Sequence, residues 1–76
     1  MDPQAVLFIS RFDHALRNIA MAHGLDGRAC DAIKQAVLME NAPECLSLWA
    51  ESPESDIREA ARIRVQQYAR EHKQIN

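Results

Sequence analysis

The feature that most constrains the fold of this chain is residues 52–72, which have the pattern of one long amphipathic helix. Ser52 is a residue type favoured at helix N-caps, and Pro53 suits the first helical position, where its missing N–H group would have no partner. Apolar residues then recur at steps of three and four, with charged and amide side chains between them. We therefore expect a helix over residues 53–72 whose apolar side is buried against other helices.

A second start signal lies at the amino end. Asp2 followed by Pro3 repeats the N-cap and proline pattern, and apolar residues at helical spacing follow it. Gly24 comes directly after this periodic run, and glycine is the residue that most often takes the left-handed conformation at the end of a helix. We expect a first helix over residues 3–22.

Two shorter helices are predicted between the long ones. Asp26 is a suitable N-cap for a second helix over residues 27–40. Asn41, followed three residues later by Glu44, has the spacing of a capping box and predicts a third helix over residues 43–51.

Together these helices predict an all-α fold, a compact bundle of four helices with short turns. The short third helix is not stable alone, so we expect it to pack on the fourth as a helical hairpin, with Cys45, Leu48 and Trp49 close together. Residues 1–73 should form a single domain, with residues 74–76 as a frayed end. The residues expected in the core are Phe8, Phe12, Leu16, Ile33, Val37, Leu48, Trp49, Ile57, Val65 and Tyr68.

Size and composition favour contact with another protein chain. A chain of 76 residues hides only about 60% of its unfolded surface, so further burial in a homo-oligomer or against a protein partner is favourable. No apolar run approaches the ~18 residues of a membrane span, and no signal-peptide pattern is present, so we expect a cytoplasmic protein without a membrane partner. Cys30 and Cys45 lack metal-site spacing and are expected to be reduced core residues.

Part of the carboxyl half resembles a known family. Residues 48–61, Leu-Trp-Ala-Glu-Ser-Pro-Glu-Ser-Asp-Ile-Arg-Glu-Ala-Ala, followed by Val65, are similar to the hinge and second helix of a HEAT-type helical repeat. The resemblance covers residues 44–72 and implies a hairpin of a kind that serves protein–protein contacts. Residues 1–42 show no second copy, and repeat arrays need about three units, so no array is implied.

The sequence carries no pattern typical of an enzyme. His14, His23 and His72 are far apart along the chain, and no His-x3-His or Cys-x2-Cys pair brings metal ligands together. No serine lies in a glycine-rich elbow, and no phosphate-binding loop is present. We expect no catalytic, cofactor-binding or metal-binding residues and no cofactor.

The leading functional prediction is a small non-enzymatic interaction module, a regulator or adaptor that presents helix faces to a protein partner or to its own copy. Val6 and Leu7 widen the apolar face of the first helix and are candidates for such a contact. Arg58, Arg62 and Arg64 on the last helix could meet an acidic partner. The alternative for these arginines is a solvated face, because glutamates lie one turn before Arg58 and Arg62.

The alternative function is a helix-turn-helix regulator that binds DNA through residues 19–38. Arg28, Lys34 and Gln35 would then face the major groove, and Arg17 would contact phosphate. Nucleic acid is the less favoured partner, because the chain before the fourth helix has more acidic than basic residues and DNA binding depends on phosphate neutralisation.

Overall fold

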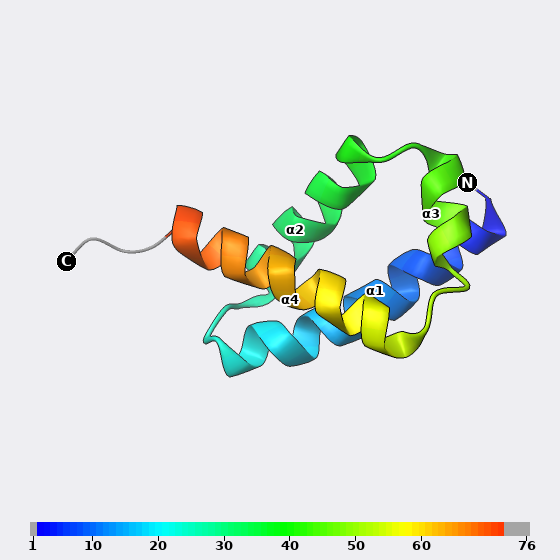
Figure 1. The fold of residues 1–76 in the computed structure, drawn as a ribbon. Coiled ribbons are helices and arrows are strands. Elements are labelled where there is room, and N and C mark those ends of the chain that lie inside the picture. The colour runs from blue at the N-terminus through cyan, green and yellow to red at the C-terminus, as the bar shows by residue number, and fades with distance from the viewer. Residues whose placement is uncertain (1, 73–76) are drawn as a thin grey trace.

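The computed structural model describes residues 2–72, and this part of the chain contains four α-helices and no strand (Figure 1). The helices are α1 (Pro3–Ala22), α2 (Gly27–Glu40), α3 (Pro43–Trp49) and α4 (Glu54–Glu71). The all-α prediction is confirmed, although α3 and α4 are shorter than expected. The predicted fraying of residues 74–76 lies outside the described residues. Within residues 2–72, no helix combines the length and the apolar character needed to cross a membrane.

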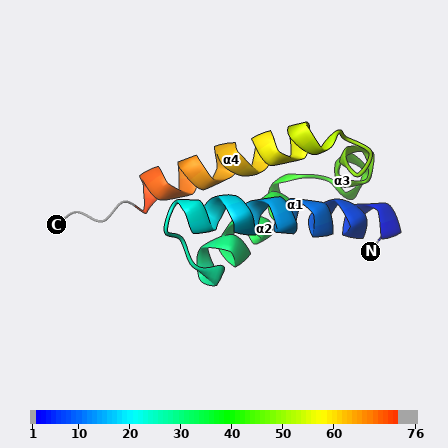
Figure 2. The same cartoon turned by 90° about the horizontal axis from the view of Figure 1, so that it is seen from below.

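The other three helices pack on α1. In Figure 1, α1 and α4 run in the same direction and α2 returns in the opposite direction. The short α3 crosses near the amino end of α1, and Figure 2 shows it almost end-on. Because α2, α3 and α4 all pack against α1, the core lies along a single side of α1.

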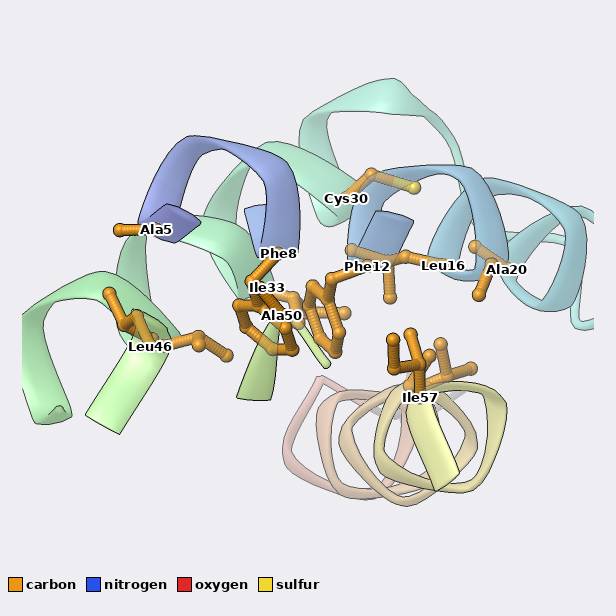
Figure 3. Packing of buried hydrophobic residues seen from close by; sticks show 14 residues of the cluster. Ala5, Phe8, Phe12, Leu16, Ala20, Cys30, Ile33, Leu46, Ala50 and Ile57 are labelled. Carbon is orange, nitrogen blue, oxygen red and sulfur yellow. The ribbon is translucent and has the colours of Figure 1, made fainter. Parts of the chain in front are cut away.

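The core is apolar and continuous along α1 (Figure 3). Phe12, Leu16 and Val65 are the largest side chains that are almost fully buried, and the rings of Phe8 and Phe12 stack with their centroids 5.6 Å apart. Seven predicted core residues are confirmed as buried: Phe8, Phe12, Leu16, Ile33, Val37, Ile57 and Val65. Tyr68 is only partly buried and packs against the edge of the core.

The predicted start signals of α1 and α2 are confirmed by hydrogen bonds. The Asp2 side chain accepts a bond of 3.0 Å from the Gln4 N–H, and the Asp26 side chain accepts one of 3.1 Å from the Ala29 N–H. Gly24 has a φ of +74°, the left-handed conformation expected after α1. These caps are local in sequence, which is why they could be predicted.

The predicted start signals of α3 and α4 are wrong. The N-cap positions are Ala42 and Pro53, and neither helix has a side-chain cap. The Asn41 amide instead donates to the Val37 carbonyl, 2.9 Å away, and so serves the end of α2. Ser52 is not the cap because the helix begins one residue later than predicted, after Pro53 in an extended conformation.

The predicted orientation of α3 is also wrong. Its buried side carries Leu46 and Ala50, whereas Leu48 is 72% exposed and Trp49 is 38% exposed. Cys45 is exposed too. Cys45, Leu48 and Trp49 therefore lie together, as expected, but on the outward side of α3. The physical reason is the packing partner: α3 has its main contacts with α1, not with α4, so the expected α3–α4 hairpin packing is replaced by a crossing of α3 over α1.

Candidate protein-binding cleft

A cleft of about 290 Å³ opens where the carboxyl end of α2, α3 and the first half of α4 meet over α1. We call it the central cleft. Its base is formed by buried rings of α1, and polar side chains of α4 and of the turns after α2 and α3 also line it. The residues that line it are Phe8, Phe12, Val37, Asn41, Trp49, Ser52, Asp56, Ile57, Ala60 and Arg64.

Trp49 forms the α3 wall of the central cleft. Its ring meets Phe8 edge-on, with the centroids 5.6 Å apart and an angle of 63° between the planes. Phe8 is buried, but Trp49 keeps 38% of its surface exposed. Edge-to-face contact holds the tryptophan in a fixed orientation while it leaves part of the ring open to solvent. The chain's one tryptophan therefore lies at the mouth of an apolar cleft.

Arg11 holds the turn that positions this wall. Its Nη1 atom donates to the carbonyl oxygens of Ala50, at 2.8 Å, and of Ser52, at 2.9 Å. These carbonyls follow the end of α3, where backbone acceptors lack helical partners. Sequence reasoning missed this role, because the partners lie 39 and 41 residues away and no local pattern relates them.

An ion pair closes one side of the cleft. Arg64 Nη2 on α4 lies 2.9 Å from Glu40 Oε1 on α2, and the same guanidinium makes a second hydrogen bond to Glu40. The hydrogen bond from Arg64 lowers the pKa of the Glu40 carboxyl below its ordinary value. Arg64 also lines the groove between α2 and α4, so this pair separates the central cleft from that groove.

The structure does not bring the predicted partner-binding residues into one surface. Val6 and Leu7 are exposed on α1, but neither lines the central cleft. Arg64 lies at its rim, whereas Arg58 lines a groove between α1 and α4 on the other flank of α4. Arg62 points to neither groove and pairs within its own helix.

Two of these arginines form the helical pairs that the sequence spacing indicates. Arg58 Nη1 lies 3.6 Å from Glu54 Oε2, and Arg62 is hydrogen-bonded to Glu59. The hydrogen bond that Arg62 donates to the Glu59 carboxylate raises the pKa of Arg62 above its ordinary value. Both pairs are exposed, so the charges of Arg58 and Arg62 are balanced at the surface of α4.

The residues of the DNA-binding alternative divide into two groups. Arg17 and Lys34 each reach Asp13 at 3.0 Å, and both also lie within 3.8 Å of Asp31. Partial burial by itself raises the pKa of Asp13, but hydrogen bonds from Lys34 and Arg17 outweigh it and lower the pKa below its ordinary value. Two of the predicted phosphate- or base-contacting cations are thus already engaged with carboxylates.

The other two residues of that alternative, Arg28 and Gln35, are exposed on α2. Neither belongs to this charge cluster. The structure therefore leaves one exposed cation, Arg28, on the helix that would enter the major groove, and DNA affinity depends on several such charges.

In the described part of the chain, the histidines and cysteines form no metal-binding cluster. Among residues 2–72, no three His, Cys, Asp or Glu side chains lie together in a way that could hold a metal ion. Both cysteines are free thiols; Cys30 is buried, but Cys45 is exposed, which corrects its predicted core position. Burial raises the pKa of the Cys30 thiol above its ordinary value.

Neither a model of a known family, nor a curated protein, nor a solved structure matches this chain. The resemblance of residues 44–72 to a HEAT-type hairpin therefore stays a prediction. The central cleft is the site that the geometry itself indicates.

Proposed function

We propose that this chain is a small non-enzymatic protein–protein interaction module, a regulator or adaptor that acts in the cytoplasm. The central cleft is the surface that we propose for a protein partner. The observation that carries the proposal is Trp49, which stays 38% exposed at the mouth of a cleft whose base is the buried aromatic pair of α1.

The outward side of α3 extends this apolar surface. Leu48 is 72% exposed beside Trp49, and Cys45 lies one turn before both. Tryptophan is enriched among the few residues that supply most of the affinity at protein interfaces, and exposed neighbouring apolar groups mark such contact sites. A partner that covered this side would remove the exposed surfaces of Leu48 and Trp49 from water.

The size of the cleft indicates what it would accept. The cleft of about 290 Å³ is at the lower end of the range for ligand pockets, and one large apolar side chain would fit within it. The Glu40–Arg64 pair and the Ser52 side chain lie at its edge, where an interface normally has its polar rim. We therefore propose an amphipathic helix with one leucine, methionine or phenylalanine anchor as the partner segment.

Selection from a displayed library of helical peptides tests this function. We expect selected peptides to share one large apolar anchor, to bind in an anisotropy titration and to shift the Trp49 emission. Leu48→Asp should weaken binding by at least about 10-fold, because it places a charge beside the anchor site. Met21→Asp is the matched control, because Met21 is also exposed but lies at the other end of α1.

Two results would contradict the proposal. One is that no peptide is enriched over a library selected without the protein. The other is equal binding by the wild type and Leu48→Asp. The DNA-binding alternative predicts a different outcome, namely binding to duplex DNA at low salt that weakens steeply as salt rises and is reduced by Lys34→Ala.

A further inference from the structure

The outer face of α4 carries a short pattern of which only Asp56 also lines the central cleft. Asp56, Ile63 and Arg70 are spaced seven residues apart and are all exposed. Seven residues are almost two helical turns, so the three side chains lie along one line on the helix surface. The buried side of α4 carries Ile57, Ala61 and Val65, so this line lies on nearly the opposite side. We call these three residues the α4 strip.

The centre of the α4 strip is an apolar residue without a core role. Ile63 is 44% exposed and lies outside the buried cluster. In Figure 2, α4 runs along one edge of the molecule with α1 on one side of it only. A β-branched aliphatic residue in the middle of a charged helix face gives that face one anchor that another chain can cover.

The two ends of the strip carry opposite charges that form no ion pair within residues 2–72. Within residues 2–72, the ion pairs of α4 involve Arg58, Arg62 and Arg64. Asp56 and Arg70 take part in none of them. The helix dipole explains their signs, because acidic residues suit the first turn and basic residues suit the last. It does not explain their equal spacing on either side of Ile63.

We propose that the α4 strip is a homodimer interface in which α4 packs antiparallel against α4 of a second copy. With Ile63 opposite the same residue of the other copy, Asp56 of each chain comes opposite Arg70 of the other. Both ends, about 21 Å apart along the helix, then gain an ion pair. A surface that is its own complement under a two-fold rotation is what an isologous dimer requires.

The residues between these positions fit the same register. One turn on either side of Ile63, Glu59 and Ala60 come opposite Gln67 and Gln66. Arg62 and Arg64, which flank Ile63, are paired with Glu59 and Glu40 within the same chain. A parallel arrangement would instead place Asp56 on Asp56 and Arg70 on Arg70. Antiparallel pairing also aligns the two helix dipoles favourably. The contact is small, so a weak, concentration-dependent dimer is expected.

This inference rests on the proposed function only in that the chain acts through protein contacts, since the α4 strip shares only Asp56 with the lining of the central cleft and does not include Leu48. Sedimentation equilibrium of the full chain at low salt tests it. We expect reversible dimers, and Ile63→Asp should raise the dissociation constant by at least about 10-fold. Met21→Asp is the matched control, because Met21 is also an exposed apolar residue, lies on α1 and should leave the dissociation constant unchanged.

Charge reversal makes the test specific. Asp56→Arg and Arg70→Asp should each abolish the homodimer, because each places like charges opposite one another at both ends. An equimolar mixture of these two variants should form a heterodimer, because both ion pairs are then restored. Circular dichroism of each variant checks that the helices persist.

A chain that stays monomeric up to about 1 mM would overturn the proposal, as would single variants and their mixture that associate like the wild type. Leu48→Asp should dimerise normally. A chain that stays monomeric but still binds selected peptides through Leu48 would contradict the dimer proposal and support the proposed function. A chain that dimerises but binds no selected peptide would support the dimer and contradict the proposed function.

Discussion

Arg11 Nη1 lies 2.8 Å from the carbonyl oxygen of Ala50, and this contact joins the middle of α1 to the end of α3. The same nitrogen also reaches Ser52, so one side chain holds the whole turn before α4. Carbonyls at the end of a helix lack backbone partners, and a partly buried cation satisfies two of them here. The position of Trp49, and therefore the shape of the central cleft, depends on this turn.

Replacing Arg11 should destabilise the fold. Arg11→Met keeps most of the side-chain volume but leaves two carbonyls without their donor, and we expect a loss of about 1–3 kcal/mol in the free energy of unfolding. Urea denaturation followed by circular dichroism measures it. Arg28→Met is the matched control, because Arg28 is exposed on α2. Equal stability of the two variants would show that the Arg11 contacts are not needed.

The orientation of α3 predicts a contrast between two leucines that are two residues apart. Leu46 is buried and Leu48 is 72% exposed. Leu46→Ala should therefore cost about 2–5 kcal/mol, whereas Leu48→Ala should change the free energy of unfolding by no more than about 0.5 kcal/mol. Thermal unfolding of both variants tests this. The reverse order would mean that α3 faces the core with its other side.

The charge cluster around Asp13 predicts a dependence of stability on pH. Because the pKa of Asp13 is lower in the folded chain than its ordinary value of 3.8, the unfolded chain binds this proton more readily. Its stabilising contribution is complete above that ordinary value and is lost as the pH falls through the lower, folded-state pKa. Urea unfolding from neutral to strongly acidic pH measures it.

Asp13→Asn is the control for this prediction, since it cannot lose a proton. Wild type and Asp13→Asn should differ by a constant amount above the ordinary pKa and converge below it. Curves that stay parallel throughout the acidic range would show that the carboxylate is not stabilised by Lys34 and Arg17.

The two cysteines should differ in reactivity. Cys45 is exposed, whereas Cys30 is buried and its thiol pKa is raised by that burial. Because the thiolate is the reactive form, iodoacetamide should modify Cys45 in the folded chain and Cys30 only after denaturation. Mass spectrometry after a short exposure reads this directly. Native Cys45→Ser should remain unmodified, and its rapid labelling would contradict the buried position of Cys30.

The sequence was sufficient for several features that depend on neighbours along the chain, although not for the caps of α3 and α4. The all-α class, the bounds of α1 and α2 and the capping roles of Asp2, Asp26 and Gly24 follow from local hydrogen-bonding chemistry and helical spacing. The apolar sides of α1 and α2 were also predictable, because each has one dominant apolar stripe.

Features that depend on the packing partner were decided only in the tertiary structure. In α3 the pair Leu46 and Ala50 and the set around Leu48 are both apolar and both helically spaced, so periodicity cannot choose between them. The buried side of α3 is determined by its packing across α1 and by the hydrogen bond from Arg11, which is distant in the sequence, to the end of α3. This packing buries Leu46 and Ala50 and leaves Leu48 and Trp49 exposed beside the central cleft.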